Sequence, residues 1–280
     1  MRLGVMFDRG LPPEQLIPFA RALDETSVDD LWVVEDLGWT GGISAAATAL
    51  AVTSRLRVGI GITPAPLRNP MVLAMELANL ERLHPGRLAA GIGHGVEGWM
   101  RQVGAAVPSP LSLLEETITS VRALLQGQTV TLDGKSVHLD GVSLVHPPAQ
   151  PPPVLAGVKG PRSLALSGRV ANGTIVPEGI GPAQVPGIVE QIGGDEDHEL
   201  VVFAFLRLGS SEVDQAARDM VAGQSGFLGV APEELAMADG TPQEAAAWVK
   251  SVWAAGAETV AVRPIGSDPL DQVTALLSAL

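Results

Sequence analysis

Residues 56–92 decide the fold, because two apolar segments there flank a segment of helical pattern. Residues 56–62 read LRVGIGI and residues 87–92 read RLAAGI, and both are short apolar runs of the kind found in buried parallel strands. Residues 70–83 read PMVLAMELANLERL, with a proline that favours the first helical turn. The segment therefore predicts a strand–helix–strand unit.

The same alternation continues in both directions along the chain. Eight segments of strand-like pattern alternate with helical ones, which predicts an α/β fold, a single closed eight-stranded β/α (TIM) barrel rather than an open sheet. The predicted strands are residues 3–7, 31–35, 56–62, 87–92, 154–157, 173–176, 200–206 and 259–262. The predicted helices are residues 13–26, 44–53, 70–83, 111–125, 162–171, one ending near residue 193, a stretch with Gly and Pro interruptions over residues 212–253, and residues 269–280.

The alternation of strand-like and helical segments is interrupted between the fourth and fifth predicted strands. After the amphipathic segment 111–125, residues 129–145 predict two or three short β segments around the turn dipeptides at 133–134 and 140–141. Five prolines between residues 147 and 153 then stiffen the return to the barrel. We expect one domain over residues 1–280, with an insertion at about residues 93–150.

Composition excludes several functional classes. The chain of 280 residues is 46% hydrophobic and 18% charged, which allows a large core and argues against disorder. It has no cysteine, so disulfides, thiolate metal sites and a cysteine nucleophile are excluded. The five histidines are scattered without metal-ligand spacing, and no metal site is expected. A net charge of −13 gives no basic surface for nucleic acid.

Membrane and export signals are not evident either. No run of about 18 apolar residues suggests a membrane span. The amino terminus passes directly into a strand-like segment at residues 2–7 instead of the charged and apolar regions of a signal peptide. We expect a cytoplasmic protein.

In a barrel of this type the reactive side chains lie where strands end and βα loops begin. The most informative such segment is residues 157–163, GVKGPRS, at the end of the fifth predicted strand. Gly160 permits a tight turn, Pro161 favours a first helical turn, and Lys159 and Arg162 lie beside the free N–H groups of that turn. These features suit an anionic phosphate, although an ordinary connection with solvated basic residues has the same pattern.

Two other strand ends carry candidate side chains. His94 lies in the glycine-rich segment GIGHG at residues 91–95, where a flat ligand can approach the backbone and an imidazole can exchange a proton. The alternative is a packed or solvent-facing histidine. Glu35 and Asp36 are adjacent at the end of the second strand, so they should point to opposite faces, one toward a pocket and the other capping the next turn.

Two further features concern the pocket itself. The glycines and prolines of residues 59–70 indicate a bulge or a close backbone approach, with Arg68 pinning the loop or meeting an anion. Trp39 and Trp99 are expected to wall a mostly apolar substrate pocket.

Taken together in their order, these segments resemble the luciferase-like flavin and deazaflavin oxidoreductases, the superfamily of bacterial luciferase. The resemblance runs from residue 3 to residue 262 and implies a barrel with an insertion and a flavin-type ring across its carboxyl-terminal mouth. It is carried by residues 56–62, 68–70, 77–88, 91–93, 153–157, 160–163 and 171–173.

The resemblance also assigns expected roles to cofactor-binding residues. Gly160, Pro161 and Arg162 match the phosphate-binding turn of the family, and Lys159 precedes it. Gly61 and Ile62 match the place where deazaflavin-dependent members have a non-prolyl cis peptide behind the ring. Gly93 and Gly157 belong to the matching strand ends.

Catalytic roles follow in the same way. Asp36 matches a position near ring and substrate, and His94 and Glu97 lie in the loop that approaches the ring edge. Leu37 stands where several relatives have histidine, so His94 would exchange the proton instead, or no such base is needed.

The expected function is oxidoreduction, with a hydride transferred between the deazaflavin coenzyme F-420 and a small organic substrate. One alternative is an FMN-dependent monooxygenase, and another is a non-catalytic barrel that only binds such a cofactor. Lys159 and Arg162 favour the deazaflavin because its anionic tail is longer. The Ala-rich helices and low charge suggest a homodimer. Neither the substrate nor the direction of reaction follows from the sequence.

Overall fold

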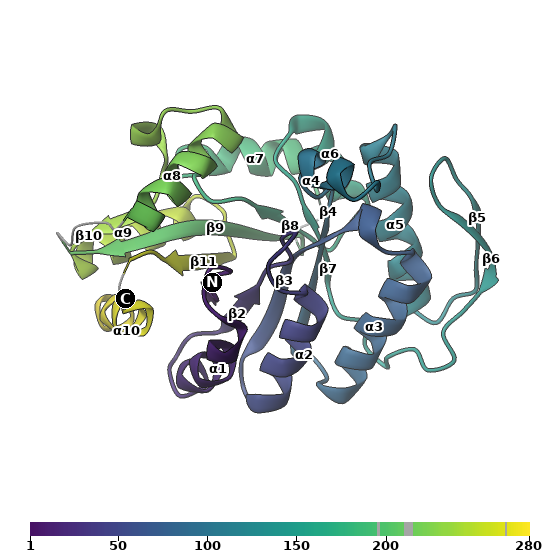
Figure 1. The fold of residues 1–280 in the computed structure, drawn as a ribbon, viewed down its shortest axis with the longest axis horizontal. Helices are drawn as coiled ribbons and strands as arrows, with labels where there is room; N and C mark the ends of the chain where they lie inside the picture. The colour runs from purple at the N-terminus through teal and green to yellow at the C-terminus, as the bar shows by residue number, and fades with distance from the viewer. Residues whose placement is uncertain (195–196, 210–214, 267) are drawn as a thin grey trace.

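The computed structural model describes residues 1–194, 197–209, 215–266 and 268–280 of the chain. Eight parallel strands form a closed barrel (Figure 1). The strand at Gly173–Val176 pairs with the strand at Glu199–Leu208, and this pairing completes the ring. The eight strands are β1 (Arg2–Met6), β2 (Asp30–Val33), β3 (Arg57–Pro64), β4 (Leu88–Gly93), β7 (Val154–Gly157), β8 (Gly173–Val176), β9 (Glu199–Leu208) and β11 (Thr259–Pro264). The prediction of a TIM barrel is confirmed.

Helices surround this barrel, and most begin at a proline in the first turn. Proline suits this place because its fixed φ matches the helix and its missing N–H would have no partner there. The longer helices are α1 (Leu16–Asp24), α2 (Gly42–Val52), α3 (Pro70–Leu83), α5 (Pro110–Leu125), α6 (Pro161–Val170), α7 (Val185–Ile192), α8 (Gln215–Leu228), α9 (Pro242–Ala254) and α10 (Pro269–Ala279).

The segment between β4 and β7 contains more than one helix. The short helix α4 (Glu97–Gln102) follows β4, and α5 then packs between α3 and α6 as a helix of the outer ring. The antiparallel hairpin of β5 (Val130–Asp133) and β6 (His138–Val142) extends from the side of the barrel (Figure 1). The predicted short β segments therefore form one hairpin.

The barrel interior is filled by aromatic side chains that glycines on neighbouring strands accommodate. Trp32 is fully buried, and its ring lies 5.3 Å from that of Phe203 in an edge-on arrangement. A Cβ atom at Gly59 would lie 2.3 Å from Trp32, and one at Gly61 would lie 2.4 Å from Phe203. The register between β3 and β4 also shifts after Ile60. The predicted bulge and close backbone approach are both present.

A network of charged side chains closes the amino-terminal end of the barrel. Arg57 donates to Asp30 and to Glu199 at 2.6 Å each, and Arg2 also donates to Asp30, at 2.7 Å. Burial alone would raise the pKa of Glu199, but the hydrogen bonds and charge of Arg57 outweigh it and lower that pKa overall. These ion pairs thus close this end of the barrel, and we call the group of Arg2, Asp30, Arg57 and Glu199 the ionic plug.

One prediction about the carboxyl-terminal third is wrong. The expected helical stretch over residues 212–253 is divided, because a short strand, β10 (Ala238–Gly240), pairs with the end of β9 and separates α8 from α9. Residues 212–214 of that stretch lie outside the described residues. A strand of only three residues has too little hydrophobic periodicity to be recognised from the sequence. No helix in the described part of the chain is long and apolar enough to cross a membrane.

Candidate functional site

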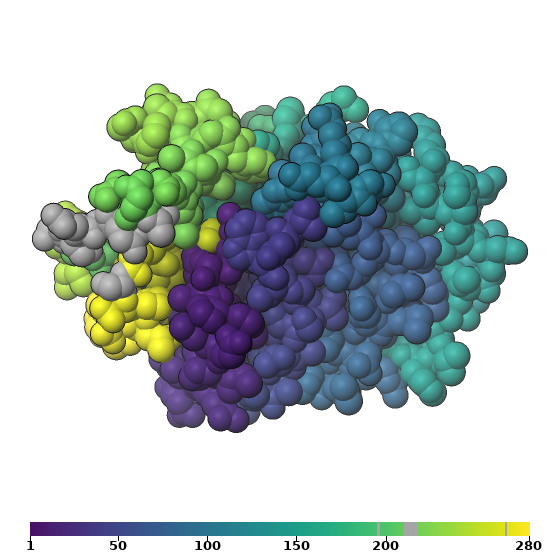
Figure 2. Space-filling model, in the orientation of Figure 1, coloured from purple at the N-terminus to yellow at the C-terminus, as the bar shows by residue number. Residues whose placement is uncertain are grey.

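A cavity of about 1010 Å³ opens at the carboxyl-terminal end of the barrel. The surface between α4 and α8 is hollowed there (Figure 2). Active sites of barrels of this type lie at this end, where the βα loops converge. Every barrel strand contributes to the lining, through Met6, Val34, Gly61, Ile62, His94, Gly157, Ile175, Phe203, Phe205 and Arg263 at or just beyond the strand ends.

One wall of the cavity is built by the ends of β3, β4 and β7. The peptide bond between Gly61 and Ile62 is cis. A Cβ atom at Gly157 would lie 2.3 Å from Ile62, and one at Gly93 would lie 2.9 Å from the Gly157 carbonyl oxygen. The absence of side chains at these glycines lets three strand ends meet around Ile62. Four of the predicted cofactor-binding residues are therefore neighbours in space.

The predicted phosphate turn lies at the start of α6. Gly160 is the N-cap residue, Pro161 is the first helical residue, and no side chain caps the first turn. A Cβ atom at Gly160 would have nothing within 4 Å, so the approach to the turn is open. Arg162 is exposed. The backbone N–H groups at this helix start are thus available to an anion.

Lys159 is directed toward α8. Its ammonium group donates to the Phe227 carbonyl oxygen at 2.6 Å and lies 3.7 Å from the centre of the Phe227 ring. Burial lowers the pKa of Lys159 below its ordinary value. Both residues line the cavity. The interaction therefore links the β7 end to α8 across one side of the cavity.

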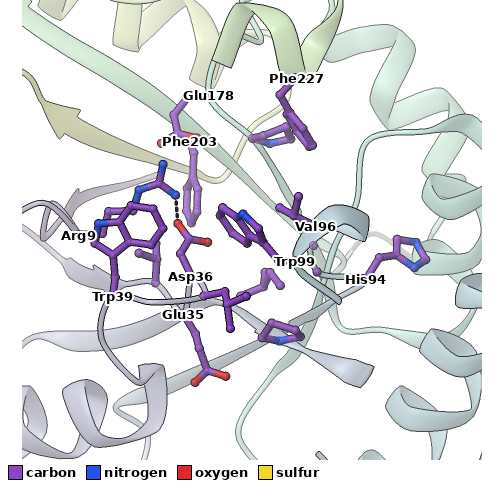
Figure 3. A pocket seen from close by; sticks show the side chains of 18 of the residues that line it. Arg9, Glu35, Asp36, Trp39, His94, Val96, Trp99, Glu178, Phe203 and Phe227 are labelled. Carbon is purple, nitrogen blue, oxygen red and sulfur yellow. Dashed lines mark hydrogen bonds and ion pairs between the residues drawn. The ribbon is translucent and has the colours of Figure 1, made fainter. Parts of the chain in front are cut away.

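His94 lines the cavity, but its ring is directed away from the tryptophans and Asp36 (Figure 3). Its Nε2 atom lies 3.2 Å from the Ser163 hydroxyl oxygen, in the first turn of α6. Burial lowers the pKa of His94, which keeps the imidazole neutral near pH 7. The structure thus connects His94 with the phosphate turn.

The two adjacent carboxylates at the end of β2 point in opposite directions (Figure 3). Glu35 accepts a hydrogen bond from the Gly42 N–H at 2.8 Å, at the start of α2, and a second one from Arg68 at 2.9 Å. Asp36 faces the cavity and forms an ion pair with Arg9. One carboxylate, Glu35, thus caps a turn as predicted, but both carboxylates contribute to the cavity lining, and Arg68 pins the loop.

Arg9 and two tryptophans form a compact group beside Asp36 (Figure 3). The Arg9 guanidinium carbon lies 4.6 Å from the centre of the Trp39 ring and 6.0 Å from that of Trp99. The two indole rings are 5.9 Å apart. This group is the most aromatic part of the lining, and both tryptophans predicted to wall the pocket belong to it. Glu97 lies at the rim, exposed, and pairs with Arg101.

A second ion network lies deeper, at the ends of β1, β8 and β11. Arg263 is nearly buried and donates to Asp8 at 2.7 Å and to Glu178 at 3.3 Å. Burial alone would lower the pKa of Arg263, but the two carboxylates raise it overall. Two carboxylates around one guanidinium leave this part of the wall with a net negative charge.

Sequence reasoning did not identify Arg9, Phe203 or Phe227 as cavity residues. Arg9 lies two residues after the predicted strand at residues 3–7, so its position alone could have suggested it. Phe203 lies inside a strand and Phe227 near the end of a helix, and neither carries a local signal. No cluster of His, Asp and Glu with the arrangement of a metal site occurs among the described residues.

Comparison with known proteins agrees with this geometry. The family described as luciferase-like monooxygenase matches residues 1–266. The chain belongs to this family. The structure of an F-420-dependent secondary alcohol dehydrogenase in complex with an F-420–acetone adduct is similar, with a TM-score of 0.85 and 16% identity, covering 100% of this chain and 98% of that one. At this identity the likeness shows the fold alone.

Curated relatives are similar over part of the chain. A 5,10-methylenetetrahydromethanopterin reductase from Methanolobus tindarius is 26% identical over 177 residues, which are 63% of this chain and 54% of the reductase. An F-420-dependent glucose-6-phosphate dehydrogenase from Kineococcus radiotolerans is 30% identical over 181 residues, with 60% and 54% covered. The chain therefore spans about half the length of the curated relatives that it matches.

Proposed function

We propose that this luciferase-like protein transfers a hydride between coenzyme F-420 and a small organic substrate. The observation that carries the proposal is the cavity itself: a glycine-lined wall at the β3, β4 and β7 ends lies next to an uncapped helix start at α6. The curated relatives named above include an enzyme that depends on the same cofactor. When bound, the deazaflavin supplies a ring carbon that accepts or releases a hydride.

The residues present suit such a group. The cavity volume of about 1010 Å³ is large enough for a fused-ring ligand together with a small substrate. The N–H groups of the first turn of α6 suit the phosphate of the anionic tail, and Arg162 adds a positive charge beside them. Lys159, Gly160 and Pro161 complete this turn. Glu97, at the cavity rim, is proposed to approach the ring edge.

The protein residues would position the reactants and exclude water. Asp36 is proposed to orient the ring or the substrate, and Trp39 and Trp99 to hold the substrate. His94 is proposed to exchange the proton that accompanies hydride transfer, since a neutral imidazole can accept one near pH 7.

Cofactor binding is the direct test. The purified protein is titrated with coenzyme F-420 and separately with FMN, and ligand fluorescence is followed. We expect a micromolar Kd for F-420 and a Kd at least tenfold weaker for an Arg162→Met variant, because a charged contact to phosphate is lost. Failure of both ligands to bind at micromolar concentration would remove the proposal and leave the barrel without this cofactor role.

His94 requires a test that separates chemistry from positioning. His94→Gln should lower kcat by about 10²-fold or more if the imidazole exchanges a proton, while leaving the F-420 Kd within about twofold. Ser163→Ala is the matched variant, because it removes the hydroxyl partner of His94 and leaves the imidazole. If both variants weaken F-420 binding equally and leave kcat unchanged, His94 serves only to hold the α6 turn.

An FMN-dependent monooxygenase is the second candidate, and the family match favours it. The two functions differ in how the reduced cofactor reacts with oxygen. Rapid oxygen uptake by the protein with reduced FMN, and none with reduced F-420, would select the monooxygenase. A protein that binds either cofactor but turns over no alcohol, aldehyde or ketone would instead match a non-catalytic barrel.

A homodimer is also proposed. The outer face of α3 carries Val72, Met75 and Leu83, which are 50%, 54% and 65% exposed and lie on one stripe of the helix. Covering such a stripe with a second copy would remove apolar surface from water. Light scattering should give the dimer mass, and Met75→Glu should give the monomer. Val189→Glu, at an exposed valine on α7, is the control.

A cytoplasmic location is proposed as well. Cell fractionation, with the protein followed by antibody, tests it. Recovery in the cytoplasmic fraction is the expected result.

A further inference from the structure

The cavity contains several cationic side chains, and most of them are already paired with carboxylates. Arg9 pairs with Asp36, and Arg263 pairs with both Asp8 and Glu178. Arg68, below them, pairs with Glu35. These pairs lie on the side of the cavity away from α6, where Figure 3 shows Asp36, Arg9 and the two tryptophans together. We call this region the substrate side.

We propose that the substrate side selects uncharged substrates with an apolar ring and a carbonyl or hydroxyl group, and that the pairing of Arg9 with Asp36 excludes phosphorylated and carboxylated compounds. This inference rests on the proposed function and adds the substrate class. Asp36 is thereby a specificity-determining residue that acts through Arg9.

The charges of the substrate side support this selection. Arg9 and Asp36 cancel, while Arg263 faces two carboxylates and leaves one negative charge. An anionic group that paired with Arg9 would have to displace Asp36 and leave that carboxylate without a partner. It would also approach Glu178, on a wall that is already negative. An uncharged substrate meets neither penalty.

The solvent exposure of the Arg9–Asp36 pair determines how strongly it should discriminate against anions. The side chains of Arg9 and Asp36 are 29% and 24% exposed, so solvent screens part of their charge. The discrimination against an anion should therefore be moderate, about tenfold in Kd, and not the larger factor of a dry site.

The shape and chemistry of the lining favour an apolar ring. Trp39 and Trp99 have their rings 5.9 Å apart at an angle of 46°, and Arg9 lies over the face of Trp39. By pairing with the guanidinium, Asp36 holds Arg9 on that indole. The result is a broad, largely apolar surface whose charges, those of Arg9 and Asp36, are paired with each other, which suits offset contact with a ring.

Two matched compounds test the selection. Acetophenone is an uncharged aryl ketone, and 4-acetylbenzoate has the same ring and ketone with one added carboxylate. Binding of each to the full chain is measured by calorimetry, with and without F-420, and glucose 6-phosphate is included as a phosphorylated compound. We expect acetophenone to bind and both anions to bind at least about tenfold more weakly. Equal affinities, or no binding of acetophenone, would overturn the proposal.

A variant that frees Arg9 gives the sharper result. Asp36→Asn keeps the shape of the side chain but removes its charge, and it should improve the affinity for 4-acetylbenzoate relative to that for acetophenone by about tenfold. Adding Arg9→Met to this variant should abolish the gain. If Asp36→Asn still binds acetophenone but shows no relative gain in affinity for 4-acetylbenzoate, then Arg9 is not the group that Asp36 keeps from pairing with anions.

A second carboxylate of the cavity lining, Asp219, provides a control. Asp219→Asn also removes one carboxylate from the cavity lining, but Asp219 accepts a hydrogen bond from Gln215 and pairs with no cation in the described structure. It should leave the discrimination unchanged. Because ketone binding is measured with and without cofactor, loss of F-420 binding would defeat only the proposed function, whereas lost discrimination would defeat only this inference.

Discussion

Both ends of the barrel contain arginine–carboxylate ion pairs, but the pairs at the two ends have different roles. At the amino-terminal end, Arg57 joins Asp30 and Glu199, whose side chains are 0% and 16% exposed, and the network closes the barrel. At the carboxyl-terminal end, Arg9 and Asp36 are 29% and 24% exposed and line a cavity. Burial makes the first network a structural plug, whereas access to solvent leaves the second free to meet a ligand.

Breaking the buried plug should have the largest effect on stability. Arg57→Met leaves Glu199 without its cation and Asp30 with Arg2 alone, and removing one partner from a buried pair costs about 3–5 kcal/mol. Urea unfolding measures the loss. The matched change at the other end, Arg9→Met, should cost about 1 kcal/mol or less, because water can solvate Asp36. Equal losses would show that exposure does not separate the two networks.

Glycine substitutions should likewise destabilise the packed interior of the barrel more than its open carboxyl-terminal end. Gly59→Ala places a Cβ atom 2.3 Å from the buried Trp32 ring and should destabilise the protein by about 1–3 kcal/mol. Gly160→Ala, at the open α6 turn, meets nothing within 4 Å and should change stability by less than about 0.5 kcal/mol. Thermal unfolding compares the two variants. A stable Gly59→Ala would mean that Trp32 can move aside.

Acid should weaken the plug by protonating Glu199. Because the pKa of Glu199 in the folded protein is below its ordinary value of 4.5, its carboxylate stabilises the fold fully above about pH 4.5. That contribution is lost as the pH falls through the lowered pKa. Unfolding measured between pH 3 and 7 should show less acid dependence in Glu199→Gln than in the wild type. Glu14→Gln, at an exposed position, should follow the wild-type curve.

The smallest effect is expected at the rim of the cavity. Glu97 and Arg101 form an ion pair one helical turn apart, with side chains 74% and 69% exposed. Glu97→Gln should therefore change stability by no more than about 0.5 kcal/mol. Chemical denaturation at low and high salt checks this, since any contribution should vanish in salt. A larger loss would indicate that α4 depends on this pair.

Much of the architecture could be predicted from local pattern. The segments 154–157 and 173–176 were predicted with their observed bounds, because short apolar runs between Gly, Pro and Asn are bounded clearly. The helix at residues 70–83 was also predicted with its observed bounds, since Pro70 marks its first turn. β10 was not predicted, because three residues that pair only with the end of β9 give no periodic signal of their own.

The candidate site could be predicted in position but not in its contacts. Strand ends indicated where Asp36, His94 and the α6 turn would lie. Glu35 and Asp36 follow β2, which ends at Val33, so their opposite directions come from the loop and not from the period of two in a strand. The partner of Asp36 was not predicted, because Arg9 is 27 residues away and reaches it only where β1 and β2 lie side by side. The contact of His94 with Ser163, 69 residues away, depends on β4 lying beside β7.

The sequence by itself therefore determined the order of the eight barrel strands and the approximate positions of most helices between them. These depend on the conformational preferences and spacing of neighbouring residues. The tertiary structure alone decided which charges neutralise one another: Arg263 meets Asp8 from 255 residues away. Closure of the barrel sets which strands are neighbours and at what register, and only then does a charged side chain acquire a partner.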